Sequence, residues 1–210
     1  LEALKDYRFD LLYTSYTKGP TKNFHIFSQF ISYLKAKNSN LSILLLNKDD
    51  NDDLENIRKI NYPHIKIVIT SSPDLFYGLC NNHLLTSGRD AQPRTITETI
   101  SKGMHNIVLD TLTNGIYIFK DTKIFGTIIP TYKTYKGKHY IPVPDKALFE
   151  KIETIAKQRK NKQRILKFSY DVLSREKLML DLVGKVYPNR KFVVTFATID
   201  YSNMASLLLN

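Results

Sequence analysis

The chain has 210 residues, of which 42% are hydrophobic and 24% charged, and its formal net charge at pH 7 is +11. This composition is ordinary for one soluble globular core, and no apolar run approaches the ~18 residues of a transmembrane helix. The excess of basic residues favours an anionic partner, such as a phosphate-bearing ligand, an anionic membrane surface or nucleic acid.

Strand-like and helix-like runs alternate from the start of the chain. Residues 9–13 form an apolar strand, and apolar side chains then recur at helical spacing from Phe24 to Leu34. Thr21 or Asn23 is the expected cap of this helix. The acidic run 49–55 fits the first turns of a second helix, where the helix dipole favours negative charge. Further strands are expected at residues 41–46, 65–69, 84–85, 107–109 and 126–130.

This alternation predicts an α/β fold with a doubly wound parallel sheet of the Rossmann-like type. Ligands of such sheets bind past the carboxyl ends of the strands. The loops that carry Lys22, residues 71–74, Asp90 and residues 113–115 all follow predicted strands. We therefore expect these loops to share one edge of the sheet.

The second half of the chain is less regular. Residues 1–187 are expected to form one domain, and 188–210 a closing strand and helix or the start of a further domain. Other predicted elements are a short helix from Ser72, a loop at 132–140, helices at 144–160 and 169–186, a strand at 191–197 and a helix from 201.

Signals for location and cofactors are few. The N-terminus has no signal-peptide pattern and no Met, so we expect a fragment or a processed product. Cys80 has no partner for an internal disulfide, which fits a reducing, cytoplasmic setting, with peripheral membrane attachment as an alternative. We expect Cys80 to be an ordinary half-buried thiol. The five histidines are scattered without ligand spacing, so neither a metal nor a cofactor is expected.

The most informative segment lies between two acids, Asp90 and Glu98, which are separated by seven residues. Pro93 stands near the start of a predicted helix that Gly103 ends. Free N–H groups at a helix start attract phosphate, and acids on either side accept hydrogen bonds from hydroxyls. A nucleotide sugar is a ligand that has both phosphates and hydroxyls. The simpler interpretation is a helix cap and a surface glutamate.

This run resembles the signature of retaining GT-B glycosyltransferases, the family that includes sucrose synthases and bacterial mannosyltransferases. The resemblance implies that Asp90 lies beside the donor sugar and that Glu98 accepts hydrogen bonds from the ribose hydroxyls. Asp90 stands where the family usually has Glu. A second match is Lys22, at the Lys-Asn step where the family places a basic residue on the donor diphosphate. Lys18 lies next to Thr17, the position of a further family arginine.

By this resemblance the chain is the donor-binding domain of a metal-independent, retaining hexosyl- or deoxyhexosyltransferase. Asp90 and Lys22 would be its catalytic residues, with Lys22, Lys18 and Arg94 near the diphosphate and the backbone N–H groups of Thr95 and Ile96 beside them. The expected partners are a nucleotide-sugar donor, a glycan or other acceptor, and further domains of the same polypeptide. Nucleic acid is not the expected partner.

A non-catalytic function is the alternative. The basic cluster at residues 157–164 and the tyrosines among lysines at 132, 135 and 140 are compatible with a module that binds RNA or an anionic surface. A solvated helix end is the simpler interpretation of the cluster.

Overall fold

The computed structural model describes residues 8–15, 22–88, 94–110, 124–136, 139–160 and 162–166. All of these residues belong to the first of two compact units of the chain, Leu1–Lys167. None of the helices in the described part has the length and apolar composition that crossing a bilayer requires.

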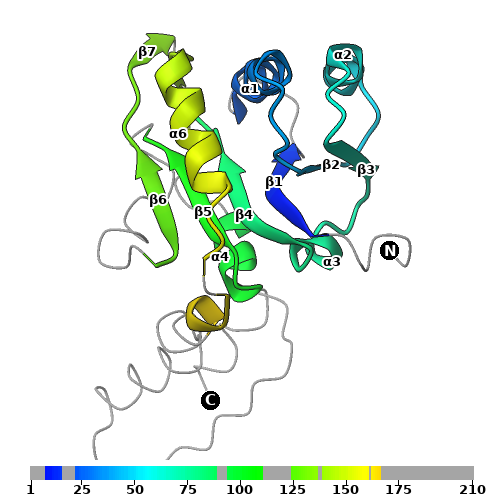
Figure 1. The fold of residues 1–210 in the computed structure, drawn as a ribbon, viewed down its shortest axis with the longest axis vertical. Helices are drawn as coiled ribbons and strands as arrows, with labels where there is room; N and C mark the ends of the chain where they lie inside the picture. Colours follow the sequence, from blue (N-terminus) through cyan, green and yellow to red (C-terminus); the bar gives the residue numbers. More distant parts are fainter. Residues whose placement is uncertain are drawn as a thin grey trace, which may run out of the picture. The chain divides into compact units, whose positions relative to one another are not determined.

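Six parallel strands form one sheet in the order β3-β2-β1-β4-β5-β6 (Figure 1). The chain builds outward from β1 through β2 to β3, then returns to the other side of β1 and continues through β4. This is the strand order of a Rossmann-like, doubly wound sheet, as the sequence predicted. The strands are β1 (Phe9–Ser15), β2 (Ile43–Asn47), β3 (Ile65–Ile69), β4 (Cys80–Leu85), β5 (His105–Leu109) and β6 (Gly126–Ile129).

Helices cover both faces of the sheet (Figure 1). Side chains of α1 (Phe24–Ala36), α2 (Asp52–Ile60) and α6 (Lys146–Ala156) pack in one apolar cluster with Leu11, Tyr13 and alternate residues of the other strands. The opposite face carries α3 (Asp74–Tyr77) and a second cluster that includes Leu12. Helix α4 (Arg94–Ser101) contacts α3 and β5 on this second face.

Local sequence signals explain where these elements begin and end. All five residues of β2 are buried, as expected for a parallel strand covered on both faces. The Asn51 side chain caps α2 by accepting a hydrogen bond from Leu54 N. Gly103 ends α4 with a left-handed φ of 76°, which a glycine adopts without strain.

Two predictions were wrong. The expected loop at 132–140 contains an antiparallel pair, β7 (Lys133–Lys136) and β8 (His139–Pro142), because tyrosine, threonine and isoleucine suit strands better than the lysine content suggested. Cys80 is buried rather than half-buried, because β4 begins at Cys80 and not near Leu84. Burial raises the pKa of the Cys80 thiol and so keeps it protonated.

The elements predicted at 169–186, 191–197 and 201–209, and the loop 113–115, lie outside the described residues. The boundary after residue 187 therefore stays a prediction.

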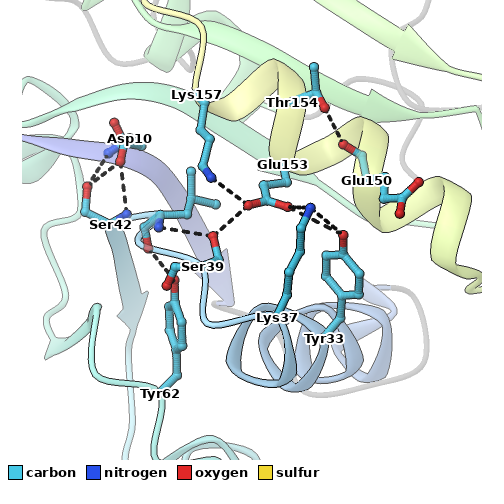
Figure 2. A network of polar contacts seen from close by, with 11 residues as sticks. Asp10, Tyr33, Lys37, Ser39, Ser42, Tyr62, Glu150, Glu153, Thr154 and Lys157 are labelled. Atoms are coloured by element: carbon cyan, nitrogen blue, oxygen red, sulfur yellow. Dashed lines mark hydrogen bonds and ion pairs between the residues drawn. The ribbon is translucent and has the colours of Figure 1, made fainter.

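A buried carboxylate holds α6 at the edge of the sheet opposite to the expected ligand edge (Figure 2). Glu153 accepts hydrogen bonds from Lys157 Nζ and Ser39 Oγ, both at 2.7 Å, and from Lys37 Nζ at 2.9 Å. Burial raises the pKa of the Glu153 carboxyl, but the hydrogen bonds from Lys157, Ser39 and Lys37 outweigh burial and lower it to about 2. Lys37 follows α1 and Lys157 follows α6, so one charge joins the ends of both helices.

Replacing Glu153 by glutamine should destabilise the fold at pH 7 by about 1–3 kcal/mol, since hydrogen bonds to a charged group are lost while the half-exposed lysines remain solvated. The low pKa of Glu153 means that its stabilisation is present above pH 4.5 and is lost as the pH falls toward 2. The difference between Glu153→Gln and wild type should therefore shrink over this range in urea unfolding. Glu150→Gln, an exposed change on the same helix, is the control; an equal loss in both variants would contradict the assignment.

Candidate functional site

The strand order reverses between β1 and β4, and this reversal defines where a doubly wound sheet can receive a ligand. The chain leaves β1 toward α1 on one face and leaves β4 toward α4 on the other. The loops therefore diverge at the carboxyl ends of these two strands, which leaves a crevice in sheets of this kind. Lys22 follows β1, and the two-acid run follows β4, so the predicted site falls at this point.

A polar cluster joins the two strand ends on the α1 face, and we call Tyr13, Lys22, Asn23 and Thr86 the Thr86 cluster. Thr86 Oγ1 donates to Lys22 O at 2.6 Å and lies 2.9 Å from the Tyr13 hydroxyl. Asn23 Nδ2 donates to Thr86 O at 2.9 Å. Burial raises the pKa of Tyr13, which stays a neutral hydrogen-bonding group.

Asn23 occupies the N-cap position of α1, but its side chain does not cap the helix. Its backbone is left-handed, with φ 50°, and its amide nitrogen is used by Thr86. Asn23 Oδ1 is buried without a hydrogen-bond partner. Such atoms are rare in folded proteins and call for an explanation. The predicted cap position is confirmed, and the predicted capping contact is wrong.

Lys22 lies directly before this helix start and is half-buried. Its carbonyl is held by Thr86, which fixes the backbone from which the ammonium group extends. The positive charge of Lys22 contributes to the low pKa of His83, the buried histidine of β4. Of the two lysines that the sequence singled out, Lys22 is described and lies between β1 and α1, beside the strand reversal. Lys18 lies outside the described residues.

The first turn of α4 presents the second helix start. Thr95 and Ile96 lie in this turn, where N–H groups have no partner within the helix. The Ile96 side chain is buried in the core, and Thr95 Oγ1 is buried without a hydrogen-bond partner. Arg94 begins the helix, but its side chain is not described. Asp90 also lies outside the described residues.

Glu98 is exposed, one turn further along α4. Its Oε2 accepts a hydrogen bond from the Tyr77 hydroxyl of α3 at 3.2 Å. Among the described residues no hydrogen bond or ion pair joins Glu98 to Lys22. The structure therefore brings Lys22 to the start of α1 and holds Glu98 against α3, on the opposite face of the sheet. Tyr77 was not among the predicted site residues.

A row of polar side chains, the His83 row, is buried beneath α4. His83 Nδ1 and Thr99 Oγ1 both lie 2.9 Å from Asn106 Oδ1, and His83 Nε2 lies 3.5 Å from Thr14 Oγ1. Burial is the largest cause of the low pKa of His83, about 4, and the Asn106 hydrogen bond opposes it. The sequence signal for this row was polar residues inside otherwise apolar strands.

Within the described residues no group of histidine, cysteine, aspartate and glutamate side chains could hold a metal ion.

Comparison with solved structures relates this arrangement to known proteins. TarM of S. aureus superimposes with a TM-score of 0.62 at 11% identity over 86% of this chain and 36% of its own. The GtfA/B complex gives 0.61 at 16% identity over 88% and 38%. A glycosyltransferase from Rickettsia africae ESF-5 gives 0.60 at 16% identity over 89% and 49%. The chain has the fold of a GT-B glycosyltransferase domain.

The chain spans about half or less of the length of these proteins. No protein-family model matches the sequence, and a search of curated proteins gave no match. The predicted doubly wound α/β fold is thus confirmed, whereas the roles of the individual site residues stay predictions.

The protonation of His83 can be tested directly. Because the Asn106 oxygen faces His83 and its amide nitrogen lies 3.4 Å from Phe125 O, we expect His83 to carry its proton on Nδ1. The imidazole should stay neutral down to about pH 5, since its pKa is about 4. Long-range proton–nitrogen NMR reads both properties, with His25, an exposed histidine of α1, as a reference signal. A proton on Nε2 would show that the Asn106 amide is turned the other way.

Proposed function

We propose that this chain is the donor-binding half of a glycosyltransferase that transfers a hexosyl or deoxyhexosyl group from a nucleoside-diphosphate sugar. The supporting observation is that two helix starts, those of α1 and α4, flank the strand reversal, and each carries a buried polar atom without a partner, Asn23 Oδ1 and Thr95 Oγ1. A bound diphosphate sugar would supply hydroxyls that can donate to Asn23 Oδ1 and phosphate oxygens that can accept from the Thr95 hydroxyl.

In this proposal Lys22 and the N–H groups of both helix starts bind the diphosphate, joined by Arg94 and Lys18. When the bond between C1 and the phosphate oxygen breaks, its electron pair stays on the diphosphate, and the acceptor oxygen bonds to C1 while its proton passes to the leaving diphosphate oxygen. Cations fixed at the diphosphate stabilise this developing charge without a metal ion. Asp90 would accept from the sugar hydroxyls, and anomeric configuration is retained, as the family resemblance implies.

Glu98 would accept from the ribose hydroxyls. Its side chain is exposed one turn into α4, and the Tyr77 hydroxyl donates a hydrogen bond to one of its oxygens. A ribose therefore meets an acceptor whose direction is already fixed, which reduces the loss of side-chain freedom on binding. Tyr77 joins the proposed site on this ground.

The acceptor would be a glycan or another hydroxyl compound bound by a further domain. A TarM variant was solved in complex with UDP and α-GlcNAc-glycerol, and this chain matches that structure over 36% of its length with a TM-score of 0.59. On this proposal residues 1–187 hold the donor, and residues 188–210 close the domain or lead to another. The chain alone then binds donor but transfers slowly.

The alternative of an RNA-binding or anionic-surface module receives less support. Within the basic cluster, Lys157 pairs with Glu153, Lys160 donates to Gln158, and Lys162 donates to Gly78 O. These lysines are exposed, but each already has a partner within the chain. Nucleic-acid binding would fall steeply with salt concentration, which separates the two functions in any binding assay.

Lys22→Ala should weaken nucleotide-diphosphate binding about ten- to hundredfold, the usual range for a lost charge-assisted hydrogen bond. Calorimetry of the wild type with UDP, GDP and ADP identifies the preferred base. The affinity for that nucleotide is then measured for each variant. Lys59→Ala removes an exposed lysine of α2 and is the matched control. Equal affinity of Lys22→Ala and wild type would refute the role of Lys22.

Glu98→Gln tests the ribose contact through the ligand as well as the protein. If Glu98 accepts from the ribose 2′-hydroxyl, the 2′-deoxy nucleotide should bind wild type about tenfold more weakly and should lose little further affinity in Glu98→Gln. Glu150→Gln is the control for the charge change. Independent, additive losses from the two changes would place Glu98 away from the ribose.

A further inference from the structure

The polar residues of the His83 row, His83, Asn106 and Thr99, are buried, and burying polar groups costs free energy that burying apolar residues does not. His83 and Asn106 are fully buried, and they lie opposite each other in neighbouring strands, with Leu12 opposite His83 in β1. Most of the buried side chains around them on this face are apolar. A buried polar group stabilises the fold less than an apolar one unless every hydrogen bond is satisfied. What such groups provide is direction, because a hydrogen bond fixes position and apolar contact does not.

Thr99 transmits that direction to α4. Its hydroxyl lies 2.7 Å from Thr95 O, 3.0 Å from Ile96 O and 2.9 Å from Asn106 Oδ1, so it bridges the first turn of the helix and β5. Helix α4 has eight residues, and its buried apolar side chains are Ile96 and Ile100. Apolar contacts of two isoleucines are not directional, whereas the Thr99 hydrogen bonds and the hydrogen bond from Tyr77 to Glu98 are.

The other end of the row reaches the ligand edge. His83 Nε2 approaches Thr14, which is half-buried and lies one residue before the end of β1. The row thus runs on the α4 face from the first turn of α4 to the end of the strand that leads to Lys22. The Thr86 cluster makes the corresponding connection on the α1 face.

We propose that Thr99, Asn106 and His83 are positioning residues, which hold the first turn of α4 in register with the ends of β1 and β4 so that both helix starts meet one ligand. This inference rests on the proposed nucleotide site. Binding sites need their groups held within about 0.5 Å of the productive geometry, and a one-ångström error can cost about a hundredfold.

The test uses Thr99→Val, which removes the hydroxyl and keeps the shape, beside Thr99→Ser, which keeps the hydroxyl. Thr154→Val is the matched control, since Thr154 makes the same kind of hydroxyl bond, to Glu150 O at 2.7 Å, in helix α6. With the nucleotide that wild type prefers, Thr99→Val should lose about tenfold in affinity, while Thr99→Ser stays within about twofold. Amide hydrogen exchange at residues 95–98 should accelerate in Thr99→Val alone.

The outcomes separate the possible failures. If Thr99→Val melts earlier but binds nucleotide like wild type at a temperature where both are folded, the row is merely structural and the inference fails. If wild type binds nucleotide and Lys22→Ala weakens it, that failure leaves the proposed function intact. If folded wild type binds none of UDP, GDP and ADP, the proposed function fails and takes this inference with it.

Discussion

The hydroxyl of Thr86 joins the parts of the chain that have to converge at the strand reversal. It donates to the carbonyl of Lys22 and contacts the Tyr13 hydroxyl, while the Thr86 carbonyl accepts from Asn23. The end of β1, the start of α1 and the end of β4 therefore share one buried residue. In a doubly wound sheet these three segments diverge, so without such a connection nothing in the strand pairing would fix the Lys22 backbone relative to β4.

The two edges of the sheet differ in how their polar groups are satisfied. At the amino edge Glu153 has lysine and serine partners, and Asp10 accepts from both the backbone and the hydroxyl of Ser42 (Figure 2). At the carboxyl edge Asn23 Oδ1 and Thr95 Oγ1 are buried without partners. Asn82 Oδ1, in the interior of β4 near Asp10, is buried without a partner as well, but the two atoms at the carboxyl edge lie at helix starts. Binding sites are the places where proteins depart from the rules that the rest of the fold follows.

Much of the fold could be predicted because its signals are local. Strand β3 matches its predicted range, Gly103 ends α4, and the parallel order follows from alternating elements. The pair of β7 and β8 was missed because its lysine content suggested a loop, although its tyrosine, threonine and isoleucine residues suit strands. For the proposed site, the family resemblance pointed to Lys22, and helix signals pointed to the first turn of α4. Thr86, Tyr77 and His83 could not be found in this way, because their side-chain partners lie 21 to 73 residues away in the chain.

The two connections at the strand reversal also differ in kind, and this difference bears on how the site could work. The Thr86 cluster acts on backbone, since Lys22 O and Thr86 O are two of its acceptors, and α1 is further held by ring stacking of Tyr13 on Phe27 at 3.9 Å. The His83 row connects side chains of β4 and β5 to Thr99, on a helix of eight residues. The α1 side is therefore the fixed reference, with a 13-residue helix that buries one apolar face, and α4 is the element whose position has to be set. The affinity of a ligand that spans both helix starts depends on this arrangement. The closer α4 lies to its ligand-bound position in the free protein, the less free energy binding has to spend on moving it.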